Sequence, residues 1–430
     1  MAPTTQIDSS LKNGYQSNGK VKNNNSCSVI KCNATLAEQK ISIRGLVGKL
    51  LSSPNPDKEI LSLGVGDASA FAAFREGRDV SRCIMESVNS GTFHGYPPAH
   101  GFPFVRRAVA DYLSWGVSQK FNEKDVFMTV GGTQAIQVIL TVLANQGCNV
   151  LLPRPGFPPY EATCEINHIE PRYYDLLPNS NWEVDLDQVR NLTDSKTVGI
   201  VVINPNNPCG AVYSRSHLTK IAETAAELNL PLIADEIYGH MVFREAKFVP
   251  MASLCSIVPV LTLGALSKRW LVPGWRCGWV AISDRNGALS QVRMAMERLM
   301  NVTSGPASII QAALPGLLSD SNDEFHSNVV KLLESSEEAL FHMIQKIPAL
   351  ICHSRPQGSM FMMVQLDYSL LKGIGDDMEF ASKLMKEESV LILPGTVIGL
   401  ENWIRIFFGT PPDLLKEAMG RIMSFCSRYA

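Results

Sequence analysis

Short apolar runs alternate with helical patterns through the middle of the chain, and this alternation constrains the fold more than any other feature. Between residues 126 and 282, runs of strand length are separated by stretches with an apolar face at helical spacing. This order predicts an α/β domain with a largely parallel sheet. The expected strands are Val126–Val130, Cys148–Leu152, Val198–Ile203, Pro231–Ala234, Val258–Leu263 and Gly278–Ile282.

The ends of the chain have a different character. Residues 1–33 are rich in Asn, Ser, Gly and Lys, and they predict a disordered tail. In the C-terminal third, long helical patterns surround short apolar strands. That pattern predicts a second, smaller domain of α+β type.

The bulk composition disfavours several classes of protein. The formal net charge is −2, which gives no basis for a nucleic-acid or acidic-membrane partner. No apolar stretch reaches the roughly 18 residues that span a bilayer, and the first residues lack the apolar core of a secretory signal. The ten cysteines include no C-x-x-C pair, and we interpret them as reduced thiols of a cytoplasmic protein without a metal site.

Lys268 closely follows the apolar run Val258–Leu263. Burial disfavours the ammonium form and lowers its pKa, and a neutral lysine amine is a nucleophile that forms Schiff bases. Eight residues later, Arg276 presents a guanidinium that suits a phosphate. Together the two side chains indicate a carbonyl cofactor that carries a phosphate, such as pyridoxal 5'-phosphate.

Four other expected strands end at residues that allow two interpretations each. The helix that opens at Gly131–Gln134 suits a phosphate, or it is an ordinary capped turn. Phe157 either stacks on a planar cofactor or packs in its loop. The Asn204–Gly210 turn is rigid and could aim an amide at a ligand. Asp235 either pairs with a protonated ring nitrogen or caps the next helix. Ligands of open α/β sheets bind beyond the carboxyl ends of the strands, which favours one shared site.

These residues resemble the motifs of class I aminotransferases of fold type I, which depend on pyridoxal phosphate. The matching motifs are S-K-x4-P-G-x-R-x-G from Ser267 to Gly278, the N-P-x-G turn Asn207–Gly210 and the D-E-x-Y strand end Asp235–Tyr238. The resemblance extends from about Ile41 to the C-terminus. The segments S-K-R-W-x-V-P-G-W-R, P-R-P-G-F-P and I-N-P-N-N-P-C-G resemble the plant tyrosine aminotransferase group, which also includes nicotianamine aminotransferases and a C–S lyase.

The resemblance implies a two-domain architecture. Residues 76–315 would form a large cofactor-binding domain with a mostly parallel seven-stranded sheet between helices. Residues 316–430 would form the smaller α+β domain. Residues 34–75 would supply an N-terminal arm and part of that smaller domain.

The resemblance also implies how the cofactor is held. Lys268 would carry pyridoxal phosphate as an internal aldimine, and Asp235 would keep its ring nitrogen protonated. Asn207 and Tyr238 would donate hydrogen bonds to the ring 3'-oxygen, and Phe157 would stack on the ring. Lys268, Asp235 and Tyr238 would be the catalytic residues. The phosphate would be bound by Gly132, Thr133, Gln134, Ser267 and Arg276.

The resemblance also implies which residues bind the substrate and which residue reaches a partner subunit. Arg405 would bind the substrate carboxylate as a bidentate pair, with Asn207 and the backbone N–H of Gly66 nearby. Tyr96 would reach the phosphate of the neighbouring subunit in a homodimer with shared sites. From the residues alone, Arg405 would be a snorkelling side chain, Tyr96 a turn aromatic and Gly66 a strand-end glycine. An apolar substrate lining is expected from Phe157, Trp270, Met360 and Phe361.

The implied reaction is ping-pong transamination of an aromatic L-amino acid, tyrosine or phenylalanine, with a 2-oxo acid as acceptor. Lys268 would serve as general base and then as general acid. β-Elimination by a C–S lyase and a nicotianamine aminotransferase-like activity remain alternatives, because they use the same residues. A non-catalytic binding protein on this scaffold is a further alternative, which the intact Lys268, Asp235 and Arg276 disfavour.

Three positions depart from the usual pattern of the class. Ala265 stands where a glycine or serine is usual, which puts more weight on Thr133 and Ser267 as phosphate ligands. Cys277 replaces an aliphatic residue. Ala68 replaces a proline after Gly66 and Asp67, so we expect a less rigid loop there.

Overall fold

The computed structural model describes residues 32–37, 43–75, 80–319 and 323–430. The chain forms two units, Met1–Glu38 and Gln39–Ala430. Helix α1 (Ala34–Ala37) lies in the first unit, and all other described elements lie in the second. The predicted tail over residues 1–33 lies outside the described residues apart from Cys32 and Asn33.

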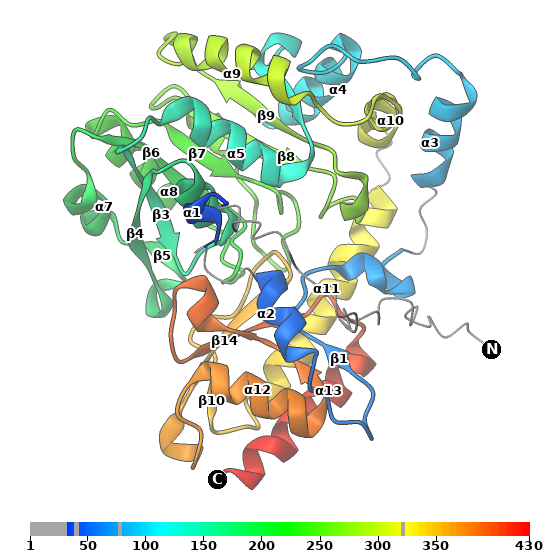
Figure 1. Ribbon diagram of the computed structural model, residues 1–430, viewed down its shortest axis with the longest axis vertical. Helices are drawn as coiled ribbons and strands as arrows, with labels where there is room; N and C mark the ends of the chain where they lie inside the picture. Colours follow the sequence, from blue (N-terminus) through cyan, green and yellow to red (C-terminus); the bar gives the residue numbers. More distant parts are fainter. Residues whose placement is uncertain (1–31, 38–42, 76–79, 320–322) are drawn as a thin grey trace, which may run out of the picture. The chain divides into compact units, whose positions relative to one another are not determined.

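A large mixed sheet forms the centre of the upper half of the second unit in Figure 1. Its strand order is β2-β9-β8-β7-β6-β3-β4-β5. Strand β9 pairs antiparallel with β2 and β8, and β5 pairs antiparallel with β4. The other neighbouring strands are parallel. The strands are β2 (Val126–Thr129), β3 (Asn149–Arg154), β4 (Glu170–Leu177), β5 (Glu183–Val184), β6 (Thr197–Ile203), β7 (Leu232–Asp235), β8 (Val260–Ala265) and β9 (Gly278–Ser283).

The predicted α/β class with a mostly parallel sheet is confirmed. Every expected strand is present, and no strand end is shifted by more than two residues. With β4, which the apolar pattern did not reveal, the sheet has the expected seven strands, and the two-residue strand β5 extends its edge. Strand β4 begins with Glu170, Pro171 and Arg172 and is half-exposed along much of its length, so it contains no apolar run.

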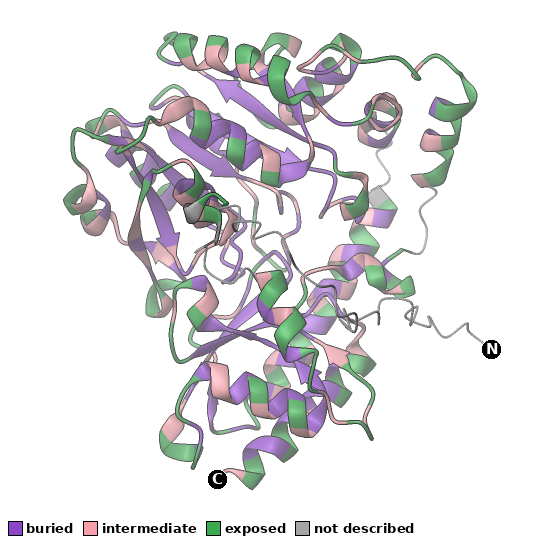
Figure 2. Cartoon of the chain, viewed as in Figure 1, coloured by how far each residue is buried: buried purple, intermediate pink, exposed green. Residues whose placement is uncertain are grey.

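Helices cover both faces of this sheet. On one face, α5, α6 and α9 pack against strand residues such as Leu263 and Val280. On the other face, α4 and α10 pack against Met128 and Trp279. The strands are buried and the outer sides of the helices are exposed (Figure 2). The helices are α3 (Val80–Asn89), α4 (Pro103–Leu113), α5 (Gly131–Leu143), α6 (Pro159–Ile166), α7 (Leu186–Leu192), α8 (Arg215–Glu227), α9 (Ser290–Thr303) and α10 (Ser308–Ser319).

A second, antiparallel sheet of order β10-β11-β14-β13 lies in the lower half of Figure 1 with α2, α11, α12 and α13. A parallel pair between β1 and β12 joins residues 61–62 to the C-terminal part of the chain. The domain boundaries expected from the sequence remain predictions. The elements are α2 (Ile43–Leu50), β1 (Leu61–Ser62), α11 (Asp323–Ile344), β10 (Leu350–Ile351), β11 (Phe361–Leu366), α12 (Asp377–Glu388), β12 (Val390–Leu391), β13 (Leu393–Pro394), β14 (Trp403–Phe407) and α13 (Pro412–Arg428).

Within the described part of the chain, no helix combines the length and the apolar character needed to cross a membrane.

A buried carboxylate links segments of the two sheets. Glu337 of α11 is fully buried and forms ion pairs with Arg244, which follows β7, and with Arg355, which lies between β10 and β11. Arg355 donates from Nε and Nη2 to the two carboxylate oxygens, at 2.9 Å and 3.0 Å. Arg244 also donates to the carbonyl of Pro356 at 2.7 Å. Burying a carboxylate costs free energy, and pairing with two arginines offsets that cost.

We expect Glu337→Gln to lower the free energy of unfolding by about 2 kcal/mol. Removing one member of a buried pair costs about 3–5 kcal/mol, and the cost is smaller here because the arginines keep 27% and 31% exposure. Urea unfolding monitored by circular dichroism measures the effect. The matched control is Glu338→Gln at a side chain with 52% exposure, where the loss should be much smaller. Equal losses in both variants would contradict the role of the buried pair.

Candidate active site

Lys268 lies in the turn that follows β8, and its side chain is half-buried. Its Nζ donates a hydrogen bond to the carbonyl oxygen of Gly66 at 2.6 Å. Desolvation lowers the pKa of Lys268 to about 8, the carboxylate of Asp67 opposes this shift, and Arg405 and Arg276 add to it. The neutral amine is therefore more accessible near pH 7 than in a free lysine.

Asp235 is the last residue of β7, and it pairs in register with Leu263 of the parallel strand β8. The two strands therefore bring Asp235 and the Lys268 turn to the same edge of the sheet. The carboxylate is 3% exposed and accepts hydrogen bonds from Tyr160 Oη at 3.1 Å and from the backbone N–H of Ile237 at 3.3 Å. Desolvation raises the pKa of Asp235 to about 6, although both hydrogen bonds lower it.

No lysine, arginine or histidine in the described ranges forms an ion pair with Asp235. The carboxylate is therefore a buried acceptor whose protein partners are both neutral. A protonated nitrogen of a bound ring would supply the missing positive charge.

The start of α5 and Arg276 form a cradle for an anion. No side chain caps the N-terminus of α5, so its first N–H groups are free to bind an anion. Gly131 has a φ of +72°, and a Cβ at this position would lie 2.5 Å from Arg276 Nη2. The guanidinium donates to the carbonyls of Pro273 at 2.9 Å and Val130 at 3.4 Å. Only a glycine lets Arg276 lie this close to the helix start.

The predicted phosphate ligands on α5 and after β8 differ in exposure. Gly132 and Ser267 are buried, and Thr133 is exposed. The side-chain oxygen of Gln134 accepts a hydrogen bond from the N–H of Val130 at 2.6 Å. The Gln134 side chain is therefore engaged at the start of α5 and is not freely placed toward an anion.

Arg405 lies in the middle of β14 and is only 4% exposed. Its Nη1 donates to Asn207 Oδ1 at 3.1 Å and its Nη2 to the carbonyl of Gly64 at 3.0 Å. The guanidinium stacks on the ring of Phe361, with its central carbon 4.1 Å from the ring centroid. Desolvation lowers the pKa of Arg405 to about 10, and Tyr238 opposes the shift.

Arg405 Nε has no hydrogen-bond partner, and no carboxylate of the described residues forms an ion pair with this side chain. A buried cation without an anion costs several kcal/mol. The surroundings of Arg405 therefore suit an anionic ligand with two oxygens, such as a carboxylate.

Tyr238 and Phe361 stand between the lysine and the arginine. The ring centroid of Tyr238 lies 5.7 Å from Lys268 Nζ, and the Tyr238 ring forms a T-shaped pair with Phe361. A Cβ on Gly66 would lie 2.5 Å from the Phe361 ring, so glycine is needed there as well. The contacts thus join Lys268, Gly66, Phe361, Arg405 and Tyr238 into one cluster.

Three predicted residues stand apart from this cluster. Phe157 is half-buried in the segment between β3 and α6, where it packs against the core under α5 and α6. Tyr96 is fully exposed, with a relative accessibility of 104%, so within one chain it does not join the site. Trp270 packs against Tyr112 and Trp279 and donates to the carbonyl of Leu317 at 3.3 Å, so it belongs to a different core and does not line the cluster.

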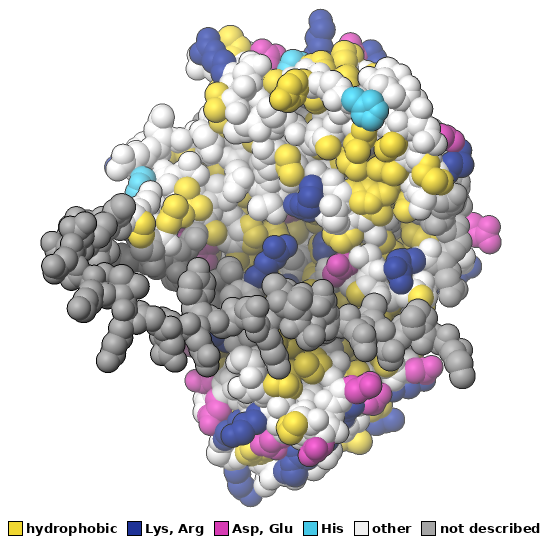
Figure 3. Space-filling model, turned by 45° about the vertical axis from the view of Figure 1, so that its right-hand side comes forward, with side chains coloured by type: hydrophobic (Ala, Val, Ile, Leu, Met, Phe, Trp, Pro, Cys, Tyr) yellow, Lys and Arg dark blue, Asp and Glu magenta, His cyan; other side chains and the backbone are white. Residues whose placement is uncertain are grey.

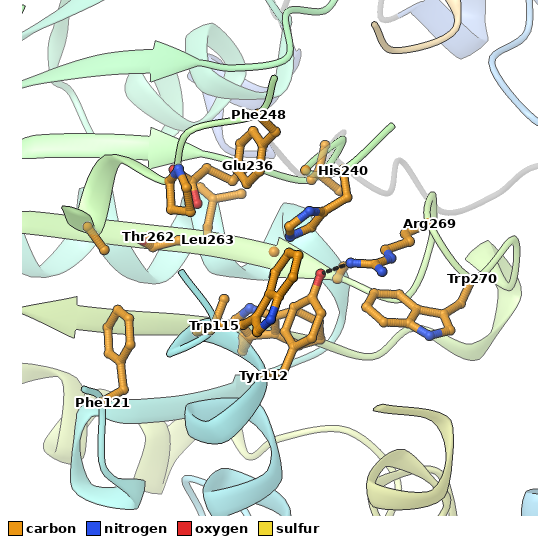
Figure 4. A pocket seen from close by; sticks show the side chains of 18 residues that line it. Tyr112, Trp115, Phe121, Glu236, His240, Phe248, Thr262, Leu263, Arg269 and Trp270 are labelled. Carbon is orange, nitrogen blue, oxygen red and sulfur yellow. Dashed lines mark hydrogen bonds between the residues drawn. The ribbon is translucent and has the colours of Figure 1, made fainter. Parts of the chain in front are cut away.

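A separate cavity lies along β8 and β9 next to α4 (Figure 4). Its lining includes Glu236, His240 and Tyr112, whose hydroxyl accepts a hydrogen bond from Arg269 at 2.9 Å. Burial raises the pKa of Glu236 to about 8 and lowers the pKa of His240 to about 4. Neither Lys268 nor Asp235 lines this cavity.

The sequence placed Gly131 in a helix start that suits a phosphate without giving it a role of its own, and it did not single out Tyr160. The signal for Gly131 was present, because two consecutive glycines after a strand suggest a close approach by another group. Tyr160 carried no signal, because a tyrosine in the first turn of a helix is ordinary. Its relation to Asp235 depends on how α6 packs against β7.

The sequence profile of the family described as aminotransferase class I and II matches residues 58–422. The chain belongs to the class I and II aminotransferases. As a family, these enzymes depend on pyridoxal phosphate. The chain is 44% identical to nicotianamine aminotransferase 1 of Oryza sativa subsp. japonica, in a match that covers 91% of this chain and 80% of that protein.

Two further relatives show how broad the family is. The S-alkyl-thiohydroximate lyase SUR1 of Arabidopsis thaliana is 40% identical, and the match covers 91% of this chain and 85% of the lyase. Among solved structures, tyrosine aminotransferase from Leishmania infantum superimposes with a TM-score of 0.89 at 33% identity, covering 94% of this chain and 100% of that structure. These likenesses bear out the predicted family, and the aminotransferase function and its lyase alternative both fit it.

We expect Gly131→Ala to weaken the affinity for pyridoxal phosphate at least about tenfold, because the added methyl group would displace Arg276. Equilibrium dialysis of the purified variants measures this affinity. The control is Gly147→Ala, at a φ of +85° and with no atom within 4 Å of the added Cβ. Both variants should lose about 1 kcal/mol of stability from backbone strain. Equal cofactor affinities in the two variants would contradict the cradle.

Proposed function

We propose that this aminotransferase binds pyridoxal 5'-phosphate and transfers the amino group of an aromatic L-amino acid, tyrosine or phenylalanine, to a 2-oxo acid. The observation that carries the proposal is the buried guanidinium of Arg405, which has no carboxylate partner among the described residues and lies in one cluster with Lys268. An α-amino acid brings the two groups that this arrangement lacks, a carboxylate for Arg405 and an amine beside Lys268.

The residues present fit the cofactor. Lys268 would hold its aldehyde carbon, Asp235 its ring nitrogen, and Asn207 and Tyr238 its 3'-oxygen, while Phe157 would cover one face of the ring. Two structural observations support this fit: Asp235 is buried without a cationic partner, and Gly131 leaves room for Arg276 at the start of α5. When bound, pyridoxal phosphate draws electrons away from the Cα–H bond of an attached amino acid. The phosphate would be held by Gly132, Thr133, Gln134, Ser267 and Arg276.

Three side chains of the protein would then have separate roles in the reaction. Arg405 binds and orients the substrate carboxylate through paired N–H groups. Lys268 has a depressed pKa, so its Nζ could take the proton from the substrate Cα and deliver it to the former aldehyde carbon of the bound cofactor. Asp235 remains anionic once it faces a cation, and it keeps a proton on the ring nitrogen.

The aromatic amino donor is supported by the relatives. The superimposed Leishmania infantum structure is named a tyrosine aminotransferase. Phe361 and Tyr238 offer aromatic surface beside Arg405 and Lys268. The rival activities are transamination of nicotianamine and β-elimination by a C–S lyase, which relatives at 44% and 40% identity carry in their names.

We further propose that the enzyme works in the cytoplasm as a homodimer with shared sites. Tyr96 is fully exposed, as expected of a residue that completes the phosphate site of a second copy. Other large hydrophobic residues are exposed in neighbouring segments, namely Met85 and Val88 of α3 and Phe104 of α4. Hydrophobic side chains also gather on the upper part of the face in Figure 3.

A donor and acceptor panel tests the proposed reaction. With added pyridoxal phosphate, we expect the enzyme to convert tyrosine and phenylalanine to their 2-oxo acids when 2-oxoglutarate is the acceptor. Chromatography measures the 2-oxo acids, and parallel assays measure pyruvate and thiol release from a cysteine conjugate. Thiol and pyruvate release without 2-oxo acid formation from tyrosine would establish the lyase instead.

The control for this panel is a pair of lysine variants. Lys268→Ala should lower kcat at least about a thousandfold, because it removes the general base and the cofactor attachment. Lys196→Ala removes an exposed lysine and should leave kcat unchanged. A Lys268→Ala variant with near wild-type turnover would overturn the proposed function.

A further inference from the structure

The segment between β3 and α6 places two side chains near the edge where Asp235 lies. Phe157 is its predicted ring-stacking residue, and three positions later Tyr160 lies in the first turn of α6. The N–H of Tyr160 donates to the carbonyl of Phe157 at 3.1 Å. The Tyr160 side chain is 2% exposed, and its hydroxyl donates to Asp235 Oδ2 at 3.1 Å. One short, rigid segment thus holds both residues.

The direction of this hydrogen bond is settled by chemistry. Burial and the neighbouring Asp235 carboxylate raise the pKa of Tyr160 well above its ordinary value, so the phenol keeps its proton. A protonated phenol donates to the carboxylate and stabilises its charged form. Desolvation acts in the opposite sense and raises the pKa of Asp235. Tyr160 therefore opposes the tendency of the buried carboxyl group to take up a proton.

A proton shared between Asp235 and a ring nitrogen can lie on either atom. When Tyr160 donates to Oδ2, the carboxylate is a weaker base, so it would leave the proton on the ring nitrogen of a bound cofactor. Without that donor, the carboxylate is a stronger base and would draw the proton to itself. Asp235 would then no longer keep the ring positively charged and strongly electron-withdrawing.

We propose that Tyr160 is a positioning residue that keeps the shared proton on the cofactor ring nitrogen by donating a hydrogen bond to Asp235. This inference rests on the proposed function, because it requires pyridoxal phosphate at the site. Tyr160 acts through Asp235, and no contact with substrate is needed for its effect. It therefore governs turnover and leaves the binding of the substrate carboxylate at Arg405 unchanged.

The test is a pH titration of the cofactor-loaded enzyme, followed by its visible absorbance, for wild type and Tyr160→Phe. In the loaded enzyme Lys268 Nζ would be joined to the cofactor, and a positive charge on the ring nitrogen would disfavour a proton on Nζ. If the ring loses its charge, the pH midpoint of the absorbance change should rise by about one unit, as expected from the loss of a hydrogen bond to a charged group. In the same variant, kcat should fall about tenfold or more, while KM for the amino acid stays within about twofold.

The control is Tyr174→Phe. Tyr174 is also a fully buried tyrosine of the large sheet, and its hydroxyl donates to the carbonyl of Val201 at 2.5 Å. Its removal deletes a buried hydroxyl without touching Asp235, so the midpoint and kcat should remain those of wild type. A midpoint that moves equally in both variants would show a general loss of packing and would overturn the proposal.

Neither substitution alters the other charged groups around the titrating atoms. Glu236 adjoins Asp235, and its side chain accepts a hydrogen bond from the N–H of Met251 at 2.6 Å. The charged groups that act on Lys268 are Asp67, Arg405 and Arg276. Because these groups stay in place, a change confined to Tyr160→Phe reports on the phenol.

A second replacement keeps the test valid if Tyr160→Phe fails to fold. 3-Fluorotyrosine at position 160 keeps the shape of the ring and is a more acidic donor. It should move the midpoint to lower pH, opposite to the phenylalanine variant. A midpoint that does not move with fluorotyrosine, or that moves to higher pH, would overturn the proposal. If the wild-type protein forms no visible band with pyridoxal phosphate, the proposed function fails, whatever Tyr160 does.

Discussion

The buried positive charge of Arg405 is the constraint on which the rest of the site depends. The side chain is 4% exposed, and among the described residues it meets an amide, a carbonyl and an aromatic ring, with no carboxylate. These neutral partners hold the guanidinium in place but do not balance its charge. The structure therefore keeps an unpaired cation close to Lys268, whose own pKa is lowered in part by that charge. An anionic ligand relieves both effects.

The sheet explains how distant segments reach this point. Strands β7 and β8 are parallel and end at the same edge, so Asp235 and the turn with Lys268 become neighbours. Arg405 belongs to β14 of the other sheet. Strand β14 pairs with β11, which carries Phe361, and the Arg405 guanidinium lies over the Phe361 ring. The hydrogen bond from Arg405 to Asn207 connects that sheet to the loop after β6. The site thus depends on contacts between residues about 200 positions apart in the chain.

Patterns of neighbouring residues in the sequence predicted those elements that depend mainly on neighbouring residues. The apolar runs identified the central strands, and the polar residues after them identified Lys268 and Asp235. Strand β4 was missed because it has no apolar run, and Arg405 became a site residue only through the family resemblance. Tyr160 could not be found, because its partner Asp235 is set by the packing of α6 on the sheet. Trp270 was expected near the substrate, but it packs against Tyr112 and Trp279.

The most direct test of the unpaired cation compares two ligands of similar shape, one an anion and one neutral. Isothermal titration of the cofactor-loaded enzyme with 3-phenylpropionate and 3-phenylpropionamide measures how much the site prefers a carboxylate. We predict that wild type binds the carboxylate at least about tenfold more tightly than the amide, as expected for a charged, bidentate pair. We also predict that Arg405→Lys loses most of this preference. Equal affinities for the two ligands in wild type would contradict the role of Arg405.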